Sequence, residues 1–493
     1  MRKSGILLPV SSLPSGYGIG SFSKEAYEFI DFLKKAGQKL WQVLPLGPTS
    51  YGDSPYQSFS TFAGNPYFID LDALAGCGLL TREECEAYDF GTDETSVDYG
   101  KLYESRGKIL RLAYQRFSGQ NDSEYQQFCQ QNEYWLKDYS MFMVLKDQHG
   151  GKSWIEWEEP YRMRQPGALL RLQETAGDEI GFYYFQQYMF RRQWDNLHLY
   201  AAKNGIQIVG DIPIYVAFDS ADTWANPELF QLDEKLTPIA VAGCPPDAFS
   251  ATGQLWGNPL YRWDYHRQTG FEWWIRRVSF CLNLYDVLRV DHFRGFDAYY
   301  SIPYGDETAE HGHWEQGPGK ELFRALKEAL GEMHIIAEDL GYLTDSVIEL
   351  VRDTGFPGMK VLQFAFDSRE ESDYLPHNYD KNCVVYTGTH DNDTICGWYE
   401  TLAAPDKELS IRYMNNADTP VNEIQWDFIR LAMASVADTC IIPMQDYLGL
   451  GSEARINVPS TLGTNWKWRM KKGQIDDALA ERICEMSRLY GRG

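Results

Sequence analysis

The segment VLRVDHFRG (residues 287–295) joins a short apolar run to an aspartate, a histidine and a glycine. Two later segments have the same design, HIIAEDLG (334–341) and CVVYTGTHDN (383–392). Their apolar residues do not alternate with polar ones, which is typical of strands buried on both faces. In each segment a carboxylate follows the run, as at the carboxyl ends of parallel strands that form an active site.

Further runs of this kind occur along the chain, and helical patterns such as residues 26–36 and 322–330 lie between many of them. Gly37 and Gly331 follow these two patterns as candidate helix ends. Strands that alternate with helices indicate right-handed βαβ units and a parallel sheet. The eight runs favour an α/β fold closed into a (β/α)₈ TIM barrel over an open sheet. They are residues 6–10, 40–46, 206–216, 287–291, 334–338, 359–366, 383–387 and 440–444.

The uneven spacing of these runs predicts insertions between barrel strands. About 160 residues separate Leu46 from Ile206, too many for one crossover. Residues 72–180 are rich in Glu, Gln and Tyr, so we expect a mostly helical inserted subdomain, with residues 1–71 and 181–493 as the catalytic barrel. Residues 219–262 carry five prolines and are predicted to be an active-site loop insertion.

Charge and cysteine usage exclude several classes of partner. The 493 residues include 46 Lys and Arg against 70 Asp and Glu, a formal charge of −24. Such an acidic chain is repelled by nucleic acid and by anionic membrane surfaces. No apolar run approaches the roughly 18 residues of a membrane span. The run at 6–10 is too short for a signal peptide and is broken by Pro9. Nine scattered cysteines without a CxxC pair predict reduced thiols and a soluble, cytoplasmic protein.

Aromatic residues make up 15% of the chain. A large core accounts for most of them, and a cleft that stacks sugar rings is the functional alternative. Composition alone leaves both interpretations open.

Three carboxylates at the ends of predicted strands suggest glycoside cleavage. Asp291, Glu338 and Asp391 follow the fourth, fifth and seventh runs. A retaining α-glycosidase needs a nucleophile and a general acid/base, and a third carboxylate can steady the oxocarbenium-like transition state. A single carboxylate of this kind is better explained by a helix cap or a surface ion pair. Three at successive strand ends favour the catalytic interpretation.

The strand period suggests roles for two of these groups. Arg289 and Asp291 are two residues apart and share a face, so the guanidinium should lower the carboxylate pKa and keep a nucleophile ionised. Glu338 follows Ile-Ile-Ala, and an apolar setting should raise its pKa, as an acid requires.

Two other kinds of barrel enzyme fit less well. The chain contains no GxxxxGK[ST] segment of the Walker type, which would indicate a phosphate-handling enzyme. It also contains no HExxH segment, which would indicate a metal hydrolase. His311 and His313 are better explained as loop residues, so we expect no metal.

Long, ordered segments of the chain also match a known family. They are GILLPVSSLP (5–14), GDSPYQS (52–58), GDIPIYV (210–216), PPDAFSATGQLWGNPLY (245–261), RVDHFRG (289–295), AEDLG (337–341), PGMKVLQFAF (357–366), TGTHDND (387–393) and GSEAR (451–455). Together they resemble the 4-α-glucanotransferases, the amylomaltases or disproportionating enzymes of glycoside hydrolase family 77. The resemblance implies a (β/α)₈ barrel with insertions. It also implies transfer of α-1,4-glucan segments between maltodextrin chains, and no cofactor.

The resemblance also assigns site residues. It implies Asp291 as nucleophile, Glu338 as general acid/base and Asp391 as transition-state stabiliser. Residues 245–257 correspond to a lid over the cleft with aromatic residues Trp256 and Phe249. The implied substrate-binding residues are Tyr56, Asp211, Gln254, Trp256, Arg289, His292, His390 and Asn465. Of these, Tyr56 would stack on the sugar, Asn465 would lie near the donor side, and Asp211, Arg289, His292 and His390 would bond hydroxyls and the nucleophile.

Some positions depart from the family pattern or keep two interpretations. Some members carry an acidic residue where this chain has Ala251, so an acceptor hydrogen bond at this position is in doubt. Tyr51 is either part of a remote glucan-binding groove or an exposed turn residue. Trp466 and Trp468 are best explained by core packing.

The predicted mechanism is double displacement through a covalent glucosyl ester, with a second glucan as acceptor. The alternatives are an α-amylase-type hydrolase, in which water is the acceptor, and a non-catalytic glucan-binding protein. Products formed from maltotriose distinguish all three. The sequence is compatible with either of two roles for such an enzyme, the use of maltose or the turnover of starch or glycogen.

Overall fold

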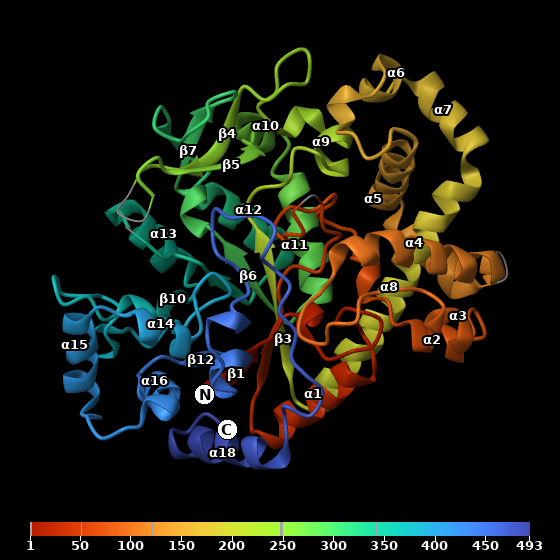
Figure 1. Ribbon diagram of the computed structural model, residues 1–493. Helices are drawn as coiled ribbons and strands as arrows, with labels where there is room; N and C mark the ends of the chain where they lie inside the picture. Colours follow the sequence, from red (N-terminus) through yellow and green to blue (C-terminus); the bar gives the residue numbers. More distant parts are fainter. Residues whose placement is uncertain (1, 51, 120–121, 247–249, 342) are drawn as a thin grey trace.

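Eight parallel strands form the central sheet of the computed structural model, which describes residues 2–50, 52–119, 122–246, 250–341 and 343–493 (Figure 1). Their order is β10-β11-β12-β1-β2-β3-β6-β9. The two edge strands approach each other, since the Ala337 N–H donates to the Pro357 carbonyl at 2.9 Å. The predicted TIM barrel is therefore confirmed. The strands are β1 (Lys3–Leu7), β2 (Leu40–Gln42), β3 (Gln207–Pro213), β6 (Val287–Asp291), β9 (Ile335–Ala337), β10 (Gly358–Val361), β11 (Cys383–Tyr386) and β12 (Thr439–Pro443).

Most of the strands are shorter than the apolar runs that predict them. The run at 40–46 continues four residues past the end of β2, and the run at 359–366 passes from β10 into the short 3₁₀ helix η7 (Leu362–Phe364). Val43 and Leu362 are both buried. Val43 still donates its N–H to the Val209 carbonyl of β3 at 2.9 Å, so buried structure extends beyond the last paired residue of the strand.

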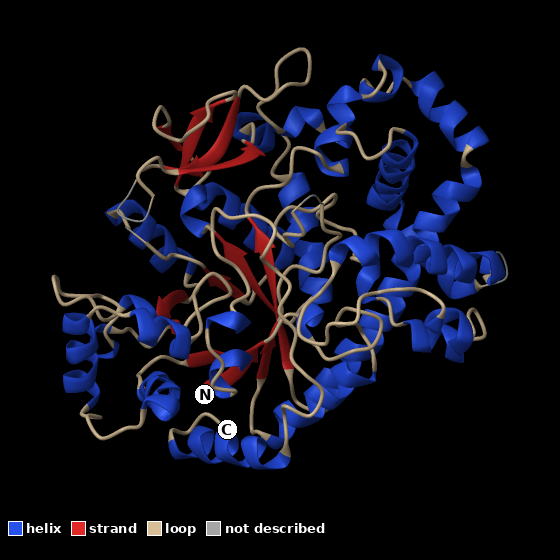
Figure 2. Ribbon diagram, viewed as in Figure 1, coloured by secondary structure: helices blue, strands red, loops and turns tan. Residues whose placement is uncertain are grey.

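Helices surround the barrel sheet (Figure 2). In α1 (Lys24–Lys35), Ala26, Phe29, Ile30 and Leu33 recur at helical spacing and are buried. In α12 (Lys320–Leu330), Leu322, Phe323 and Leu326 do the same. The predicted stops Gly37 and Gly331 have φ of 70° and 77°, a region that glycine enters without steric cost. Other surrounding helices are α10 (Trp263–Gln268), α13 (Asp345–Thr354), α14 (Ile395–Thr401), α15 (Ala404–Met414), α16 (Ile424–Ala434), α17 (Met444–Tyr447) and α18 (Asp477–Leu489).

The long segment between β2 and β3 is largely helical. Its last helix, α8, crosses residue 180 and packs on α1, where the Tyr27 and Tyr200 rings are 5.1 Å apart. One helix thus serves both the inserted segment and the barrel wall, and the division of the chain at 180 stays a prediction. The helices are α2 (Leu71–Gly76), α3 (Arg82–Glu86), α4 (Tyr99–Arg116), α5 (Ser123–Gln148), α6 (Glu159–Arg162), α7 (Pro166–Thr175) and α8 (Gly177–Lys203).

A second, antiparallel sheet has the order β5-β4-β7-β8. Its strands are β4 (Ala240–Cys244), β5 (Gln254–Pro259), β7 (Ala298–Pro303) and β8 (His313–Gln316). The sequence predicts only a loop at 219–262, yet this segment contains α9 (Ala221–Ala225), β4 and β5. Because β4 and β5 follow β3, and β7 and β8 follow β6, the sheet stands over the carboxyl ends of those barrel strands (Figure 1).

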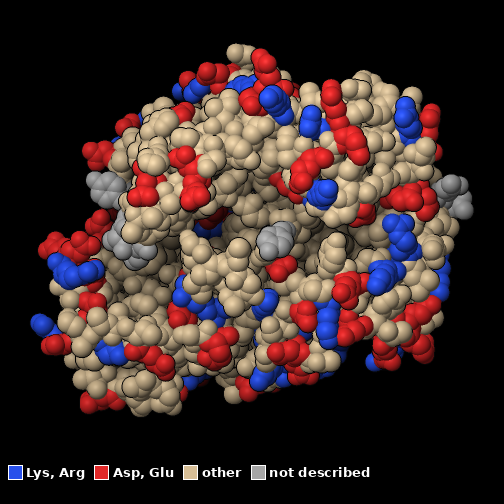
Figure 3. Space-filling view, turned by 45° about the horizontal axis from the view of Figure 1, so that its top comes forward, with Lys and Arg blue, Asp and Glu red and all other residues tan. Residues whose placement is uncertain are grey.

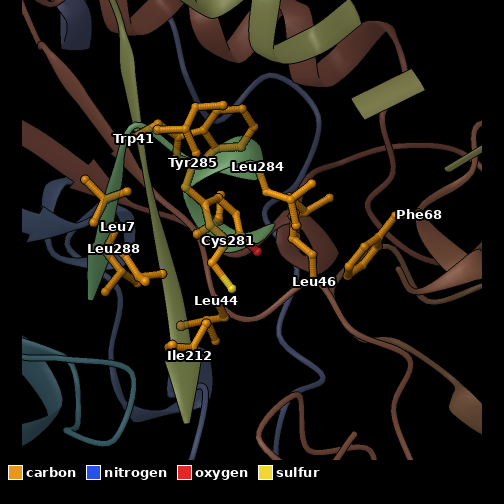
Figure 4. Packing of buried hydrophobic residues seen from close by; sticks show 14 of the residues in the cluster. Leu7, Trp41, Leu44, Leu46, Phe68, Ile212, Cys281, Leu284, Tyr285 and Leu288 are labelled. Atoms are coloured by element: carbon orange, nitrogen blue, oxygen red, sulfur yellow. The ribbon is translucent and has the colours of Figure 1, made fainter. Parts of the chain in front are cut away.

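The hydrophobic core continues from the barrel to the helix before β6. Side chains from four neighbouring barrel strands, including Leu7 and Ile212, are buried near Cys281 and Leu284 of α11 (Glu272–Leu284) (Figure 4). Gly210 allows this packing, because a Cβ there would lie 2.2 Å from the Tyr285 ring. Within the described residues, none of the helices combines the length and apolar character that crossing a bilayer requires.

Candidate active site

The three carboxylates singled out by the sequence lie at the carboxyl ends of barrel strands. Asp291 is the last residue of β6, Glu338 directly follows β9, and Asp391 lies in the loop between β11 and α14. Strands β6 and β9 are neighbours, and their ends are joined by two backbone hydrogen bonds. Glu338 N–H donates to the Val290 carbonyl at 3.1 Å, and Phe293 N–H donates to the Glu338 carbonyl at 3.0 Å. Asp291 and Glu338 are therefore fixed side by side.

Arg289 links two carboxylates beneath the site. Its Nη1 donates to both carboxylate oxygens of Asp211, at 2.8 and 2.7 Å, and its Nη2 donates to Asp291 Oδ1 at 3.0 Å. Asp211 and Arg289 are register partners on β3 and β6, which explains the close pairing. The Arg289 side chain is 3% exposed, that of Asp211 0% and that of Asp291 29%. The predicted shared face of Arg289 and Asp291 is confirmed.

The expected low pKa of Asp291 is wrong. Its pKa is raised above the usual value, because the cost of burying the charge exceeds the stabilisation by Arg289. Arg289 gives Asp291 one hydrogen bond and makes two with Asp211, whose negative charge also raises the pKa of Asp291. The Arg289 guanidinium still lowers the pKa of Asp291, but its positive charge is shared between Asp291 and Asp211.

Glu338 has the raised pKa that the sequence predicts. Burial first, and the nearby charge of Asp291 second, raise its pKa to about 7. Two backbone groups oppose the shift: His292 N–H donates to Oε2 at 2.7 Å and Leu340 N–H to Oε1 at 2.8 Å. These bonds also fix the orientation of the carboxyl group. A group with a pKa near 7 can both give and take a proton at neutral pH.

Tyr56 and His390 form an aromatic wall next to Asp211. The Tyr56 hydroxyl donates to Asp211 Oδ2 at 2.8 Å, and its ring stacks on His390 with centroids 5.0 Å apart. The Trp466 ring lies 5.8 Å from Tyr56 and 6.0 Å from His390. Trp466 and Trp468 are both buried, as core packing predicts, but Trp466 also supports this wall.

Two residues that the sequence argument missed hold Asp391. Asn457 Nδ2 donates to Asp391 Oδ1 at 2.6 Å, and Arg455 Nη2 donates to the Asp391 carbonyl at 2.7 Å. Arg455 also donates to the Asn457 carbonyl at 2.8 Å, which ties the pair together. Arg455 is the last residue of the GSEAR segment (451–455), and Asn457 lies two residues beyond it. The sequence around that segment could therefore have indicated both residues.

Asn465 makes its hydrogen bonds within its own loop. Its Oδ1 accepts from Val458 N–H at 3.0 Å, and its Nδ2 donates to the Val458 carbonyl at 3.2 Å and the Thr461 carbonyl at 2.9 Å. The loop lies beside the site through Trp466, the next residue. A direct contact between Asn465 and substrate stays a prediction.

The lid segment contributes Gln254 and Trp256, both on β5. The Trp256 ring meets the His292 ring edge to face at 4.8 Å, and its Nε1 donates to Gln254 Oε1 at 3.0 Å. Ala251 lies in the described part of this segment and is exposed. The lid aromatic Phe249 and the proposed groove residue Tyr51 lie outside the described residues.

His292 is neutral and has an available ring nitrogen. Burial lowers its pKa to about 3. Its Nε2 is buried and has no hydrogen-bond partner among the described residues. A buried polar atom without a partner is costly, and a ligand hydroxyl would satisfy it. The face that carries the site is hollowed near its middle (Figure 3).

Comparison with known proteins decides the family. The model of the 4-alpha-glucanotransferases, glycoside hydrolase family 77, matches residues 8–475. The chain belongs to this family. A 4-alpha-glucanotransferase of Clostridium butyricum is 51% identical over 98% of this chain and 99% of its own length. One of Thermus thermophilus is 47% identical over 99% and 98%.

Solved structures agree with this assignment. The amylomaltase of Streptococcus agalactiae, in complex with acarbose, is 42% identical and covers all of both chains with a TM-score of 0.96. The amylomaltase of Corynebacterium glutamicum is 16% identical, with a TM-score of 0.79 over all of this chain and 75% of its own, and supports the fold alone.

Proposed function

We propose that this protein is a 4-α-glucanotransferase that moves α-1,4-glucan segments between maltodextrin chains through a covalent glucosyl ester on Asp291. The observation that carries the mechanism is the pairing of Asp291, held by Arg289, with an adjacent Glu338 whose pKa is about 7. One carboxylate is thereby suited to attack and the other to proton transfer. The names of the full-length relatives support the activity.

In the first half-reaction, Glu338 donates its proton to the glycosidic oxygen while Asp291 attacks the anomeric carbon. The bond between the two sugars breaks, the shortened glucan leaves with the proton, and an ester forms on Asp291. Positive charge develops on the ring carbon and oxygen in the transition state, and the Asp391 carboxylate stabilises it. The Asn457 hydrogen bond holds Asp391 for this role.

In the second half-reaction, the 4-hydroxyl of another glucan gives its proton to Glu338 and attacks the anomeric carbon, whose bond to the Asp291 oxygen breaks and frees the carboxylate. Two inversions give overall retention. Acceptor binding must outcompete water, and well-oriented reactants reach effective molarities of about 10⁵ M or more. Trp256 beside His292 supplies an aromatic cover over the site that helps to exclude water.

The remaining residues hold the sugar and the nucleophile. The buried His292 Nε2 is placed to hydrogen-bond a hydroxyl, and its neutral ring leaves the charge balance unchanged. Tyr56 and His390 offer a stacked aromatic surface, Arg289 orients Asp291, and Gln254 adds an amide from the lid. The two carboxylates provide both nucleophile and proton, so the reaction needs no cofactor. We place the enzyme in the cytoplasm, where its nine free thiols stay reduced.

Maltotriose as sole substrate tests this proposal. Transfer conserves the number of reducing ends, while each hydrolytic event adds one. We expect glucose and a ladder of maltodextrins longer than maltotriose, with total reducing ends nearly constant. Chromatography together with a reducing-end assay measures both. A rise in reducing ends equal to the maltotriose consumed, without longer products, would replace this interpretation with an α-amylase-type hydrolase. No turnover would favour a glucan-binding protein.

The pH profile of kcat/KM should depend on Arg289. Activity requires Asp291 ionised and Glu338 protonated, so it falls at low pH as Asp291 gains a proton and at high pH as Glu338 loses one. Arg289 lowers the pKa of both groups. Arg289→Ala should therefore move both limbs of the bell to higher pH, whereas Arg289→Lys, which keeps the charge, should move them less. A profile that stays in place in a folded, active alanine variant would show that Arg289 does not control these ionisations.

A further inference from the structure

Trp314 is a partly exposed tryptophan on β8, at the edge of the four-stranded sheet, and 41% of it is accessible to solvent. Its indole ring is held in place on two sides. The Tyr300 ring, opposite it on β7, meets it edge to face at 5.2 Å. The guanidinium of Arg294 lies over it, 4.2 Å from the ring centroid. The ring is thus ordered before any ligand arrives.

Arg294 connects this tryptophan to the reacting groups. It belongs to the 3₁₀ turn η6 (Phe293–Phe296) directly after β6 and Asp291. Phe293, the residue before Arg294, donates its N–H to the Glu338 carbonyl at 3.0 Å, and His292 N–H donates to Glu338 Oε2 at 2.7 Å. The turn that carries Arg294 therefore lies against Glu338, and the Trp314 ring lies against the Arg294 guanidinium.

The four-stranded sheet places aromatic residues at both of its edges. Trp256 lies on the edge strand β5 next to His292, and Trp314 lies on the opposite edge strand β8. Between them, β4 and β7 are paired in register, with Gly243 opposite Tyr300. The sheet thus forms a rigid support with one tryptophan at the catalytic groups and a second further out.

We propose that Trp314 is a stacking platform for a distal glucose unit of the departing or incoming glucan. This inference rests on the proposed function. Glu338 protonates the glycosidic oxygen, so the glucan on the leaving and acceptor side extends from Glu338, the residue against which the turn with Arg294 lies. The apolar face of a pyranose ring packs on a flat aromatic ring, and a ring already fixed by Arg294 and Tyr300 loses little freedom on binding. The guanidinium beside it can donate to sugar hydroxyls.

The experiment compares acceptors of different length with one donor. α-Glucosyl fluoride serves as donor, and glucose or maltoheptaose as acceptor. A single glucose occupies only the position next to the ester, whereas maltoheptaose extends outward. We expect Trp314→Ala to lower the ratio of kcat/KM for maltoheptaose to that for glucose by roughly 3- to 10-fold, the value of one aromatic contact. Trp314→Phe should restore much of the ratio.

Tyr304→Ala provides the control, because Tyr304 is 52% exposed and follows β7 in the same hairpin but contacts neither Arg294 nor Trp314 in the described interactions. Its ratio should match the wild type. Equal losses with both acceptors, or a ratio that does not change in Trp314→Ala, would overturn the platform. A wild-type enzyme that transfers to neither acceptor and only hydrolyses the donor would instead refute the proposed transferase, and the platform with it.

Discussion

Asp291→Asn is expected to lower kcat for maltotriose disproportionation on the order of 10⁴-fold or more, the size of loss seen when a catalytic nucleophile is removed. An amide of the same shape cannot form the glucosyl ester, so both half-reactions stop. The variant should fold, because Arg289 keeps its two hydrogen bonds to Asp211 and the amide oxygen can accept the third. Product formation and the melting temperature measure the two effects separately.

Asp297→Asn is the matched control for this substitution. Asp297 is a buried aspartate six residues further along the chain, and it accepts a hydrogen bond from the Ser346 hydroxyl at 2.7 Å. It makes no hydrogen bond to Arg289 or Glu338 in the described part of the chain, and its replacement should leave kcat within a few-fold of the wild type. A residual activity of Asp291→Asn above a tenth of the wild-type value would mean that another group attacks the sugar.

The positions of the reacting carboxylates could be predicted because local sequence determines them. An apolar run long enough for a buried strand ends shortly before each carboxylate, and all parallel strands of a barrel end at the same face. The spacing of Arg289 and Asp291 likewise fixes their shared face. The pKa of Asp291 was predicted wrongly because it depends first on burial and then on Asp211, which the fold brings from β3, 78 residues before Arg289. The spacing of residues in the sequence indicates that Arg289 lies close enough to Asp291 to lower its pKa. It does not indicate the opposing charge of Asp211 or the burial of the site.

Contacts between distant segments account for the other gaps. Asn457 meets Asp391 although 66 residues separate them, and nothing local to Asn457 indicates a partner. The four-stranded sheet was missed because β4 and β5 are short, lie among prolines, and gain their remaining partners β7 and β8 only after β6. Trp314 showed no signal for the same reason, since it contacts Arg294, whose turn lies against Glu338, only in the folded chain.

Glu338→Gln should separate the two half-reactions. Without the acid, the glycosidic oxygen leaves unprotonated, and kcat with maltotriose should fall by about 10²- to 10⁴-fold. Fluoride needs no proton to leave, so α-glucosyl fluoride should still transfer its sugar to Asp291. The ester then persists, because no base activates the acceptor. We expect a burst of fluoride close to one equivalent of enzyme.

The site of the trapped ester provides the deciding observation. Mass spectrometry of the digested variant should find one added hexose on the peptide that contains Asp291, and none in Asp291→Asn treated in the same way.

The amide that Glu338→Gln introduces can accept from only one of the two backbone groups that Glu338 binds, so its NH₂ faces the N–H of either His292 or Leu340. The melting temperature must therefore be checked, and Glu338→Ala, which removes the acid without placing a donor there, should give the same burst. An adduct on another residue would show that this residue, and not Asp291, is the nucleophile. If folded Glu338→Gln and Glu338→Ala both fail to release fluoride, Glu338 does more than transfer a proton, and the division of roles between the two carboxylates is wrong.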